Sequence, residues 1–163
     1  MRNFEGQFAE VTQKAENSDC GFGQGIAVGD YNSDGFPDLF DANIGRNRLY
    51  RNNGDGTFSD VSESIGLKGD SWTTCGLIAD INGDGLADLY EVTYCGGDKP
   101  YQQACRNSRG IATCPPLEFE AAADRIWGGT AVGKFKDNTT EWAGPTSPGR
   151  GLGIVAGMFD ERP

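Results

Sequence analysis

The sequence predicts an all-β fold of the β-propeller type, with two complete repeats of about four antiparallel strands and a truncated third repeat. Three observations predict it: an internal repeat with an offset of 50 residues, short apolar segments interrupted by glycine, and 25 glycines among 163 residues. This glycine content is about twice the usual ~7% and favours short strands joined by turns. Repeats of roughly this period are typical of solenoids and propellers.

The repeat is clearest in an acidic segment that occurs twice. Residues 30–38 and 80–88 both read Asp-x-Asn-x-Asp-Gly-x-x-Asp. Side-chain oxygens recur on alternate residues, and the glycine permits a sharp turn that would aim them at one centre. Because Ca²⁺ takes about six to eight oxygen ligands, the spacing predicts one Ca²⁺ site in each loop.

Each loop is expected to supply four side-chain oxygens and one backbone carbonyl oxygen. The predicted ligands are Asp30, Asn32, Asp34, the carbonyl of Phe36, Asp38, Asp80, Asn82, Asp84, the carbonyl of Leu86, and Asp88. Aspartate, asparagine and glycine also dominate turns that bind no metal. Two loops that match at every liganding position nevertheless favour a metal over turn chemistry alone.

A second motif, Gly-x-Phe-x-acid, predicts a short strand at residues 6–12, 56–62 and 133–139. Apolar residues 25–29 and 39–43 flank the first acidic loop and predict strand–loop–strand. A hairpin is predicted around the turn at 52–56, since Asn-Asn-Gly-Asp-Gly is a strong hairpin signal. These segments provide about four strands for each period of the repeat.

The repeats divide the chain into one partial propeller. Repeat 1 covers residues 6–55, repeat 2 covers 56–132, and a truncated repeat 3 covers 133–163. Repeat 2 is longer because the counterpart of Asn47-Arg48-Leu49-Tyr50 appears only at Asp124-Arg125-Ile126-Trp127, which indicates an insertion at about 96–122. Insertions of this length are usually functional or covalently closed.

In the third repeat, residues 153–157 are the counterpart of 25–29, but Met158 and Arg162 stand where the first loop has Asp30 and Asp34. No third ion is therefore expected. A propeller needs at least about four blades, so we expect a fragment whose remaining blades belong to a longer parent chain.

The five cysteines leave several pairings open. Cys95, Cys105 and Cys114 lie in or beside the insertion, with wider spacing than zinc sites use, and a disulfide that closes the insertion is expected in an exported protein. Cys20 and Cys75 precede the two acidic loops and could also pair. Free buried thiols are the alternative.

The composition excludes several functional classes. The 14 basic and 24 acidic residues give a net charge of −10, which argues against nucleic acid or an anionic membrane as the main partner. The chain has no histidine, which removes Ser-His-Asp and Cys-His nucleophiles and histidine-ligated zinc. Neither a signal peptide nor an apolar run of membrane length is visible.

Residues 25–35 and 47–58 resemble the FG-GAP/VCBS repeats, β-propeller blades that also occur in integrin α-subunits. The second stretch is most similar to bacterial repeats of the ASPIC/UnbV type in secreted proteins. The resemblance implies a structural calcium ion in each inter-strand loop and an extracellular, cell-surface or periplasmic setting. It also implies a role in binding, adhesion or scaffolding toward a protein or carbohydrate ligand, rather than catalysis.

Two other functions compete with this interpretation. Asp41 and Glu91 stand at the twelfth loop position, where an EF-hand or dockerin places its closing carboxylate. Those folds need a helix beside the loop, which Gly25 and Gly29 disfavour. A carbohydrate-active enzyme that carries a propeller is the other alternative, with Glu118 and Glu120 as its pair of carboxylates.

Overall fold

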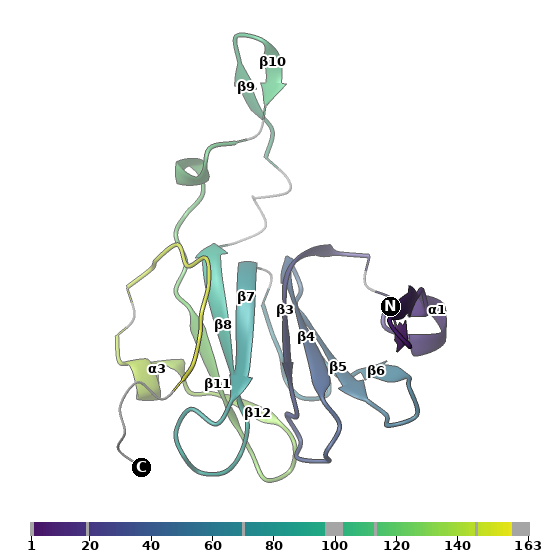
Figure 1. The fold of residues 1–163 in the computed structure, drawn as a ribbon. Helices are drawn as coiled ribbons and strands as arrows, with labels where there is room; N and C mark the ends of the chain where they lie inside the picture. Colours follow the sequence, from purple (N-terminus) through teal and green to yellow (C-terminus); the bar gives the residue numbers. More distant parts are fainter. Residues whose placement is uncertain are drawn as a thin grey trace.

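The computed structural model describes residues 2–18, 20–69, 71–96, 103–112, 114–145 and 147–157. In this part of the chain the fold is nearly all β, with short helical segments only at its periphery (Figure 1). The predicted all-β class is confirmed. Residues 158–163, where the third loop was expected to have lost its ligands, lie outside the described residues.

Blade 1 is a four-stranded antiparallel sheet in which each strand pairs with the next along the chain. Its strands are β3 (Phe22–Gly29), β4 (Asp38–Ile44), β5 (Arg48–Asn52) and β6 (Phe58–Asp60). The turn between β5 and β6 has glycines at φ +78° and +93°, at Gly54 and Gly56, as the predicted hairpin requires.

Blade 2 repeats the same order of strands and the same pairing. Its strands are β7 (Trp72–Ala79), β8 (Asp88–Cys95), β11 (Arg125–Gly129) and β12 (Phe135–Asp137). One pair of residues, Ile44 and Trp72, links β4 to β7, so the two blades form one curled sheet. The predicted blade of about four antiparallel strands is confirmed in both copies.

The motif Gly-x-Phe supplies the last strand of each blade. Phe58 begins β6 and Phe135 begins β12, so the motif closes a blade, whereas the predicted repeats 2 and 3 open with it. The predicted boundaries therefore divide the chain one strand earlier than the blades do. The corresponding Phe8 lies in a separate hairpin of β1 (Arg2–Phe4) and β2 (Gln7–Ala9), followed by α1 (Thr12–Ala15).

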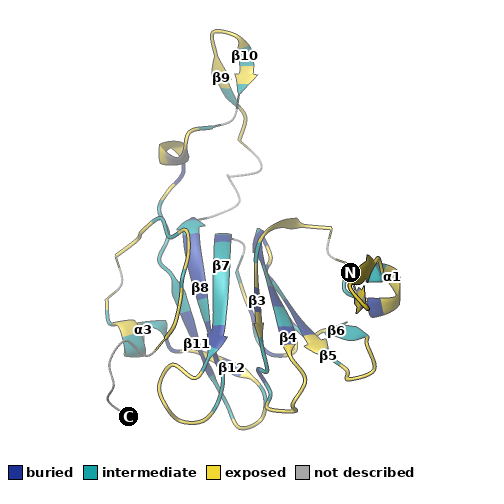
Figure 2. Cartoon of the chain, in the orientation of Figure 1, coloured by how far each residue is buried: buried dark blue, intermediate teal, exposed yellow. Residues whose placement is uncertain are grey.

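The hydrophobic core lies between the two blades, where Figure 2 shows buried residues along β4, β8 and β11. Phe40, Leu49 and Leu89 are completely buried. Glycines allow the first strands of the blades to approach closely: a Cβ atom on Gly25 would lie 2.5 Å from the Thr74 carbonyl oxygen, and one on Gly76 would lie 2.6 Å from the Phe40 ring.

The opposite face of β3 is uncovered. Ile26 and Val28 are both 60% exposed, and they alternate along the strand, so they share one face. Their counterparts in blade 2 are Gly76 and Ile78, in positions from which β7 packs against blade 1. The face through which blade 2 contacts its neighbour thus has an exposed equivalent on blade 1.

Residues 149–157 run alongside blade 2. The Gly151 amide donates to the Thr93 carbonyl oxygen at 3.1 Å, and the Thr74 hydroxyl donates to the Gly151 carbonyl oxygen at 2.9 Å. This segment includes the expected counterpart of β3, although no strand is assigned to it.

The insertion of repeat 2 forms a separate hairpin that projects from blade 2 at the end opposite the acidic loops (Figure 1). It contains β9 (Cys105–Asn107), β10 (Gly110–Ala112) and the 3₁₀ turn η1 (Pro116–Glu118). A disulfide joins Cys105 to Cys114, so the expected disulfide is present, and it closes the hairpin within the insertion. Cys20, Cys75 and Cys95 are free thiols, so the possible pairing of Cys20 with Cys75 is wrong for this structure.

Candidate calcium-binding loops

The two acidic loops occupy equivalent places, each joining the first strand of a blade to the second. Gly29 pairs with Asp38 at the base of the first loop, and Ala79 pairs with Asp88 at the base of the second. Strands enter and leave both loops, so the helix-flanked arrangement of an EF-hand or dockerin is not present. Both loops lie at the same end of the molecule (Figure 1).

In the first loop, backbone N–H groups curl the chain around its own acidic side chains. The Asp30 carboxylate accepts hydrogen bonds from the Asp34 amide at 3.1 Å and from the Gly35 amide at 2.7 Å. Asp34 Oδ1 accepts from the Phe36 amide at 2.9 Å. Asn32 Nδ2 donates to Asp34 Oδ2 at 2.8 Å, which brings the side chains of these two predicted ligands together.

The second loop repeats these contacts. Asp80 accepts from the amides of Asp84 at 3.2 Å and Gly85 at 2.8 Å, and Asp84 Oδ1 accepts from the Leu86 amide at 2.8 Å. Asn82 Nδ2 donates to Asp84 Oδ2 at 2.9 Å. Two segments 50 residues apart therefore share one side-chain arrangement as well as one sequence pattern.

The last carboxylate of each loop is completely buried and binds two backbone amides. Asp38 accepts from Tyr31 at 3.0 Å and from Asn52 at 2.8 Å. Asp88 accepts from Ile81 at 2.8 Å and from Gly129 at 2.9 Å. These aspartates tie each loop to the third strand of its own blade, a role that the sequence did not reveal.

Burial raises the pKa of Asp38 above its usual value, and the nearby carboxylates of Asp34 and Asp30 raise it further. The hydrogen bonds from the amides of Asn52 and Tyr31 act in the opposite direction. Three carboxylates in the first loop are therefore close enough to repel one another. A cation would relieve that repulsion.

The donor set consists of carboxylate, amide and carbonyl oxygens, which suits a hard cation such as Ca²⁺. Within the described residues, however, no group of three or more acidic or cysteine side chains is arranged as a metal site. The loop carboxylates face their own backbone N–H groups instead. Of the two predicted carbonyl ligands, Phe36 also packs its ring against the next turn, where a Cβ atom on Gly54 would lie 2.8 Å from it.

Both loops place their fourth and sixth residues in the left-handed backbone region. Gly35, Gly83 and Gly85 have φ of +87°, +79° and +85°, whereas the fourth residue of the first loop is Ser33 with φ +58°. A residue with a Cβ atom is disfavoured there by about 1–2 kcal/mol. The first loop is therefore more strained than the second.

Replacing Ser33 with glycine is expected to stabilise the protein by up to about 1 kcal/mol, because relief of the left-handed strain exceeds the added entropy of the unfolded chain. The reciprocal change Gly83→Ser is expected to destabilise it by a similar amount. Urea unfolding of both variants at one calcium concentration measures the two changes in the free energy of unfolding. Two changes of the same sign would contradict the assigned loop conformation.

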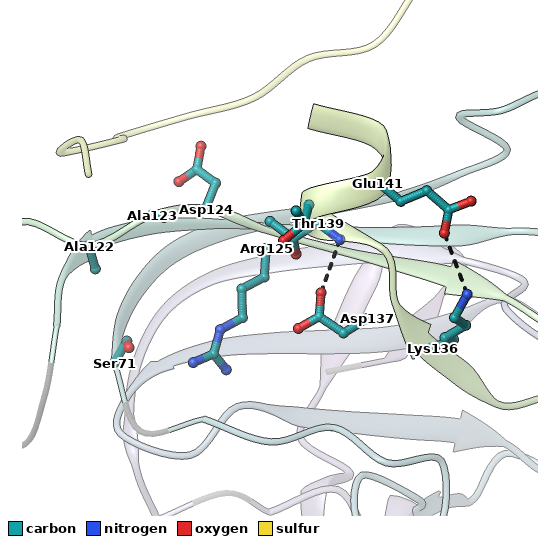
Figure 3. A pocket seen from close by; sticks show the side chains of 10 residues that line it. Ser71, Ala122, Ala123, Asp124, Arg125, Lys136, Asp137, Thr139 and Glu141 are labelled. Carbon is teal, nitrogen blue, oxygen red and sulfur yellow. Dashed lines mark hydrogen bonds and ion pairs between the residues drawn. The ribbon is translucent and has the colours of Figure 1, made fainter. Parts of the chain in front are cut away.

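Two polar clefts lie in related positions on the blades. The cleft on blade 2 has a volume of about 530 Å³ and contains Arg125, Lys136, Asp137 and Glu141 (Figure 3). Lys136 pairs with Glu141 at 3.5 Å, and Asp137 accepts from the Thr139 amide, in α3 (Thr139–Ala143), at 3.0 Å. Ligand sites are usually apolar with a few convergent polar groups, so we assign no ligand to this cleft.

The cleft on blade 1 measures about 460 Å³ and contains Arg48 and Asp60, the counterparts of Arg125 and Asp137. Arg48 and Asp60 form an ion pair, whereas Arg125 donates to the Lys68 carbonyl oxygen. These arginines join strands and linkers within the protein.

The two glutamates considered for catalysis do not form an enclosed pair. Glu118 ends η1, and Glu120 follows it on the insertion, and both are exposed. Their exposed surroundings do not offer the enclosed cleft in which a glycosidase holds its two carboxylates. In the described part of the chain, no helix has the length and apolarity needed to cross a lipid bilayer.

Comparison with known proteins places the acidic loops in a recognised repeat. Cartilage acidic protein 1 of Xenopus tropicalis is 36% identical over 97 residues, and its human counterpart is 34% identical over 96 residues. These alignments cover 56% and 58% of this chain but only 15% and 14% of the relatives, so the chain spans a small part of their length. The family model of the FG-GAP-like repeat matches residues 30–91, from the first acidic loop to the strand that follows the second. This chain therefore carries an FG-GAP-like repeat across residues 30–91.

Proposed function

We propose that this chain is a calcium-stabilised, non-enzymatic propeller module that serves extracytoplasmic binding, adhesion or scaffolding. The observation that carries the proposal is the shared arrangement of the two loops, in which Asp30, Asn32 and Asp34 are gathered in the same way as Asp80, Asn82 and Asp84. A Ca²⁺ ion bound in each loop would offset the repulsion between carboxylates. The ion's role is structural, because each loop connects the first two strands of a blade.

We propose as ligands the residues predicted from the sequence. They are Asp30, Asn32, Asp34, Asp38 and the Phe36 carbonyl in the first loop, and Asp80, Asn82, Asp84, Asp88 and the Leu86 carbonyl in the second. Asp38 and Asp88 already hold two amides each. A carboxylate oxygen has more than one lone pair, so these aspartates can keep their amides while they face an ion.

The uncovered face of β3 supports the second part of the proposal, that further blades complete the structure. Ile26 and Val28 present an apolar surface whose counterpart in blade 2, at Gly76 and Ile78, is an interface between blades. We propose another FG-GAP-like blade as its occupant, because the packing of β7 on blade 1 supplies the template. The much greater length of the relatives is consistent with additional blades.

An extracytoplasmic location is supported by the disulfide Cys105–Cys114, since disulfides persist mainly in oxidising compartments. The relatives are named for cartilage and for their acidity, and this chain shares a strongly acidic composition. We propose a protein or carbohydrate ligand rather than nucleic acid, with loops on the rigid blades as the binding surface.

Calcium titration tests the metal sites. We expect two ions to bind the unaltered chain, and one ion each to bind Asp34→Ala and Asp84→Ala. Asp55→Ala is the matched control, because Asp55 lies in an acidic, glycine-rich turn outside both loops and accepts from the Thr57 amide at 2.9 Å. That variant is expected to keep both ions.

Thermal melting checks that the ions are structural. Extracellular modules bind Ca²⁺ with Kd of about 10⁻⁴–10⁻³ M. At a concentration about 100-fold above Kd, each ion would stabilise the fold by ~2.7 kcal/mol. Removing calcium with a chelator should therefore lower Tm, and by a smaller amount in Asp34→Ala than in the unaltered chain. Unchanged stoichiometry in both loop variants, or a melting curve indifferent to calcium, would contradict the proposal.

A further inference from the structure

The disulfide-closed hairpin of blade 2 is basic, in contrast to the rest of the chain. Residues 103–112 contain Arg106 and Arg109 and no acidic residue, whereas the whole chain has a net charge of −10. Both arginines are exposed, as are Asn107 and Ser108 in the turn between them. Because the net charge of the chain is negative, this exposed basic hairpin offers an acidic partner a place to approach.

The hairpin is held in one conformation by several contacts. Arg106 pairs with Ile111 and Cys105 with Ala112 in its antiparallel register, and the Arg109 amide donates to Asn107 Oδ1 at 2.8 Å in the turn. A two-stranded hairpin this short is marginally stable in water by itself. The disulfide Cys105–Cys114 supplies the missing constraint. A constrained loop loses less entropy when it binds a partner.

The base of the insertion is anchored to blade 2. Phe119 is 5% exposed, and its carbonyl oxygen accepts from the Arg150 guanidinium at 2.6 Å. The Arg150 guanidinium also lies 5.8 Å from the centre of the Tyr94 ring in β8. The Gly96 amide donates to the Glu120 carbonyl oxygen at 3.0 Å. The segment that follows the hairpin is thus fixed to the rigid sheet.

One face of the hairpin combines a cation with an apolar side chain. Arg106 and Ile111 are directly opposite one another on neighbouring strands, so their side chains share a face, and Ile111 is 74% exposed. Arginine pairs with carboxylates through two parallel hydrogen bonds. An exposed isoleucine beside such an arginine offers contact to an apolar side chain of the same partner.

We propose that this hairpin, residues 103–112 together with the disulfide partner Cys114, is a docking element for an acidic polypeptide segment. Arg106 and Arg109 bind its carboxylates, and Ile111 contacts an apolar residue between them. Two arginines are too few for a densely charged polyanion, whose affinity grows with the number of cations that contact it. An acidic peptide with interspersed apolar residues matches both the charge and the apolar contact. This docking element does not depend on calcium in the loops.

The test is binding of a fluorescein-labelled peptide with the repeated sequence Glu-Leu-Glu-Glu, measured by fluorescence anisotropy. We expect the double variant Arg106→Gln/Arg109→Gln to weaken binding at least about tenfold, which corresponds to ~1.4 kcal/mol. The control Arg46→Gln/Arg51→Gln removes the same charge from two exposed arginines of blade 1 and is expected to change binding less than about twofold. Thermal melts establish that both variants retain the folded blades.

Two further variants separate the proposal from general charge attraction. Ile111→Ser is expected to weaken peptide binding severalfold, and so is Cys105→Ser/Cys114→Ser, because the hairpin is then no longer constrained. Three outcomes would overturn the proposal: no peptide binding, equal loss in the two double-arginine variants, or tighter hairpin-dependent binding of heparin or of vesicles with anionic lipid. The last outcome would identify the partner as a polyanion or a membrane surface instead.

Discussion

Replacing Phe40 with alanine is expected to lower the free energy of unfolding by about 3–5 kcal/mol. The Phe40 side chain is completely buried, and its ring lies where a Cβ atom on Gly76 would be only 2.6 Å away. The ring therefore fills the space between blade 1 and blade 2. Its removal loses apolar burial and leaves a cavity that the two rigid sheets cannot close.

Urea unfolding at a fixed calcium concentration measures this effect. Phe8→Ala is the matched control, because the Phe8 side chain is 69% exposed, and a change there is expected to stay within about 0.5 kcal/mol. Most domains are stable by only about 5–15 kcal/mol, so Phe40→Ala would remove a large share of the total. A loss below about 1 kcal/mol would mean that the two blades do not share one core.

The repeat made much of this fold predictable from the sequence. The 50-residue offset matched Gly25 with Cys75 and Asp30 with Asp80, and the structure places the flanking segments as equivalent strands of two blades. Strands can be identified from the alternation of apolar and polar residues and from turn-forming residues between them, because both patterns reflect interactions between residues close in the chain. The loops were located for the same reason, since their side chains bind backbone groups within a few residues.

Packing between residues far apart in the chain was harder to predict from the sequence. Phe8 and Phe135 occupy the same motif, yet Phe8 is exposed while Phe135 is buried and lies 5.9 Å from the Tyr31 ring. The motif specifies a strand and not the neighbour that covers it. The partners of Asp38 and Asp88 were missed likewise, because Asn52 and Gly129 come from distant strands. The one feature of the sequence that could have identified Asn52 and Gly129 as partners is that they occupy equivalent positions in the two repeats.

Cysteine pairing could not be read from spacing, because three cysteines lie in or beside the insertion. The short hairpin brings Cys105 to Cys114, while Cys95 stays in β8, where Arg150 Nη1 contacts its sulfur at 3.2 Å. The register of the hairpin decides which cysteine pairs with Cys105. It places Ala112 opposite Cys105, so Cys114, two residues further on, lies close to Cys105.

A polar network between the blades was also not predicted from the sequence. Asn47, in the turn between β4 and β5 of blade 1, donates to Thr73 Oγ1 at 2.9 Å and to Glu91 Oε1 at 3.0 Å in blade 2. Its own side-chain oxygen accepts from the Asn43 amide at 2.8 Å. Glu91, at the twelfth loop position, is therefore an interblade contact in β8 and only 3% exposed.

Replacing Glu91 with glutamine is expected to stabilise the protein at neutral pH. Burial raises the pKa of Glu91, and the hydrogen bond from Asn47 and the charge of Arg125 offset this only in part. The ionised carboxylate is thus destabilising in the folded state. Glutamine removes that charge and retains an oxygen that can accept from Asn47. Because the change removes a charge from a buried position, the gain should exceed the ~0.5 kcal/mol typical of surface changes.

The pH dependence of the stability difference between Glu91→Gln and the unaltered chain tests the sign of this effect a second time. Because the folded pKa lies above the ordinary value of 4.5, the folded state takes up a proton first as the pH falls. The advantage of Glu91→Gln should therefore be greatest above the folded pKa. It should shrink as the pH falls below the folded pKa and disappear below the ordinary value of 4.5, where Glu91 becomes protonated in both states.

Urea unfolding of Glu91→Gln and the unaltered chain across this range isolates Glu91, because the other titrating groups are common to both. Glu118→Gln, at an exposed position, serves as the control and should show little difference at any pH. If Glu91→Gln is less stable than the unaltered chain at neutral pH, Glu91 is ionised and favourable in the fold. The contacts from Asn47 and Arg125 would then outweigh burial, and the two blades would be joined by charge as well as by their apolar core.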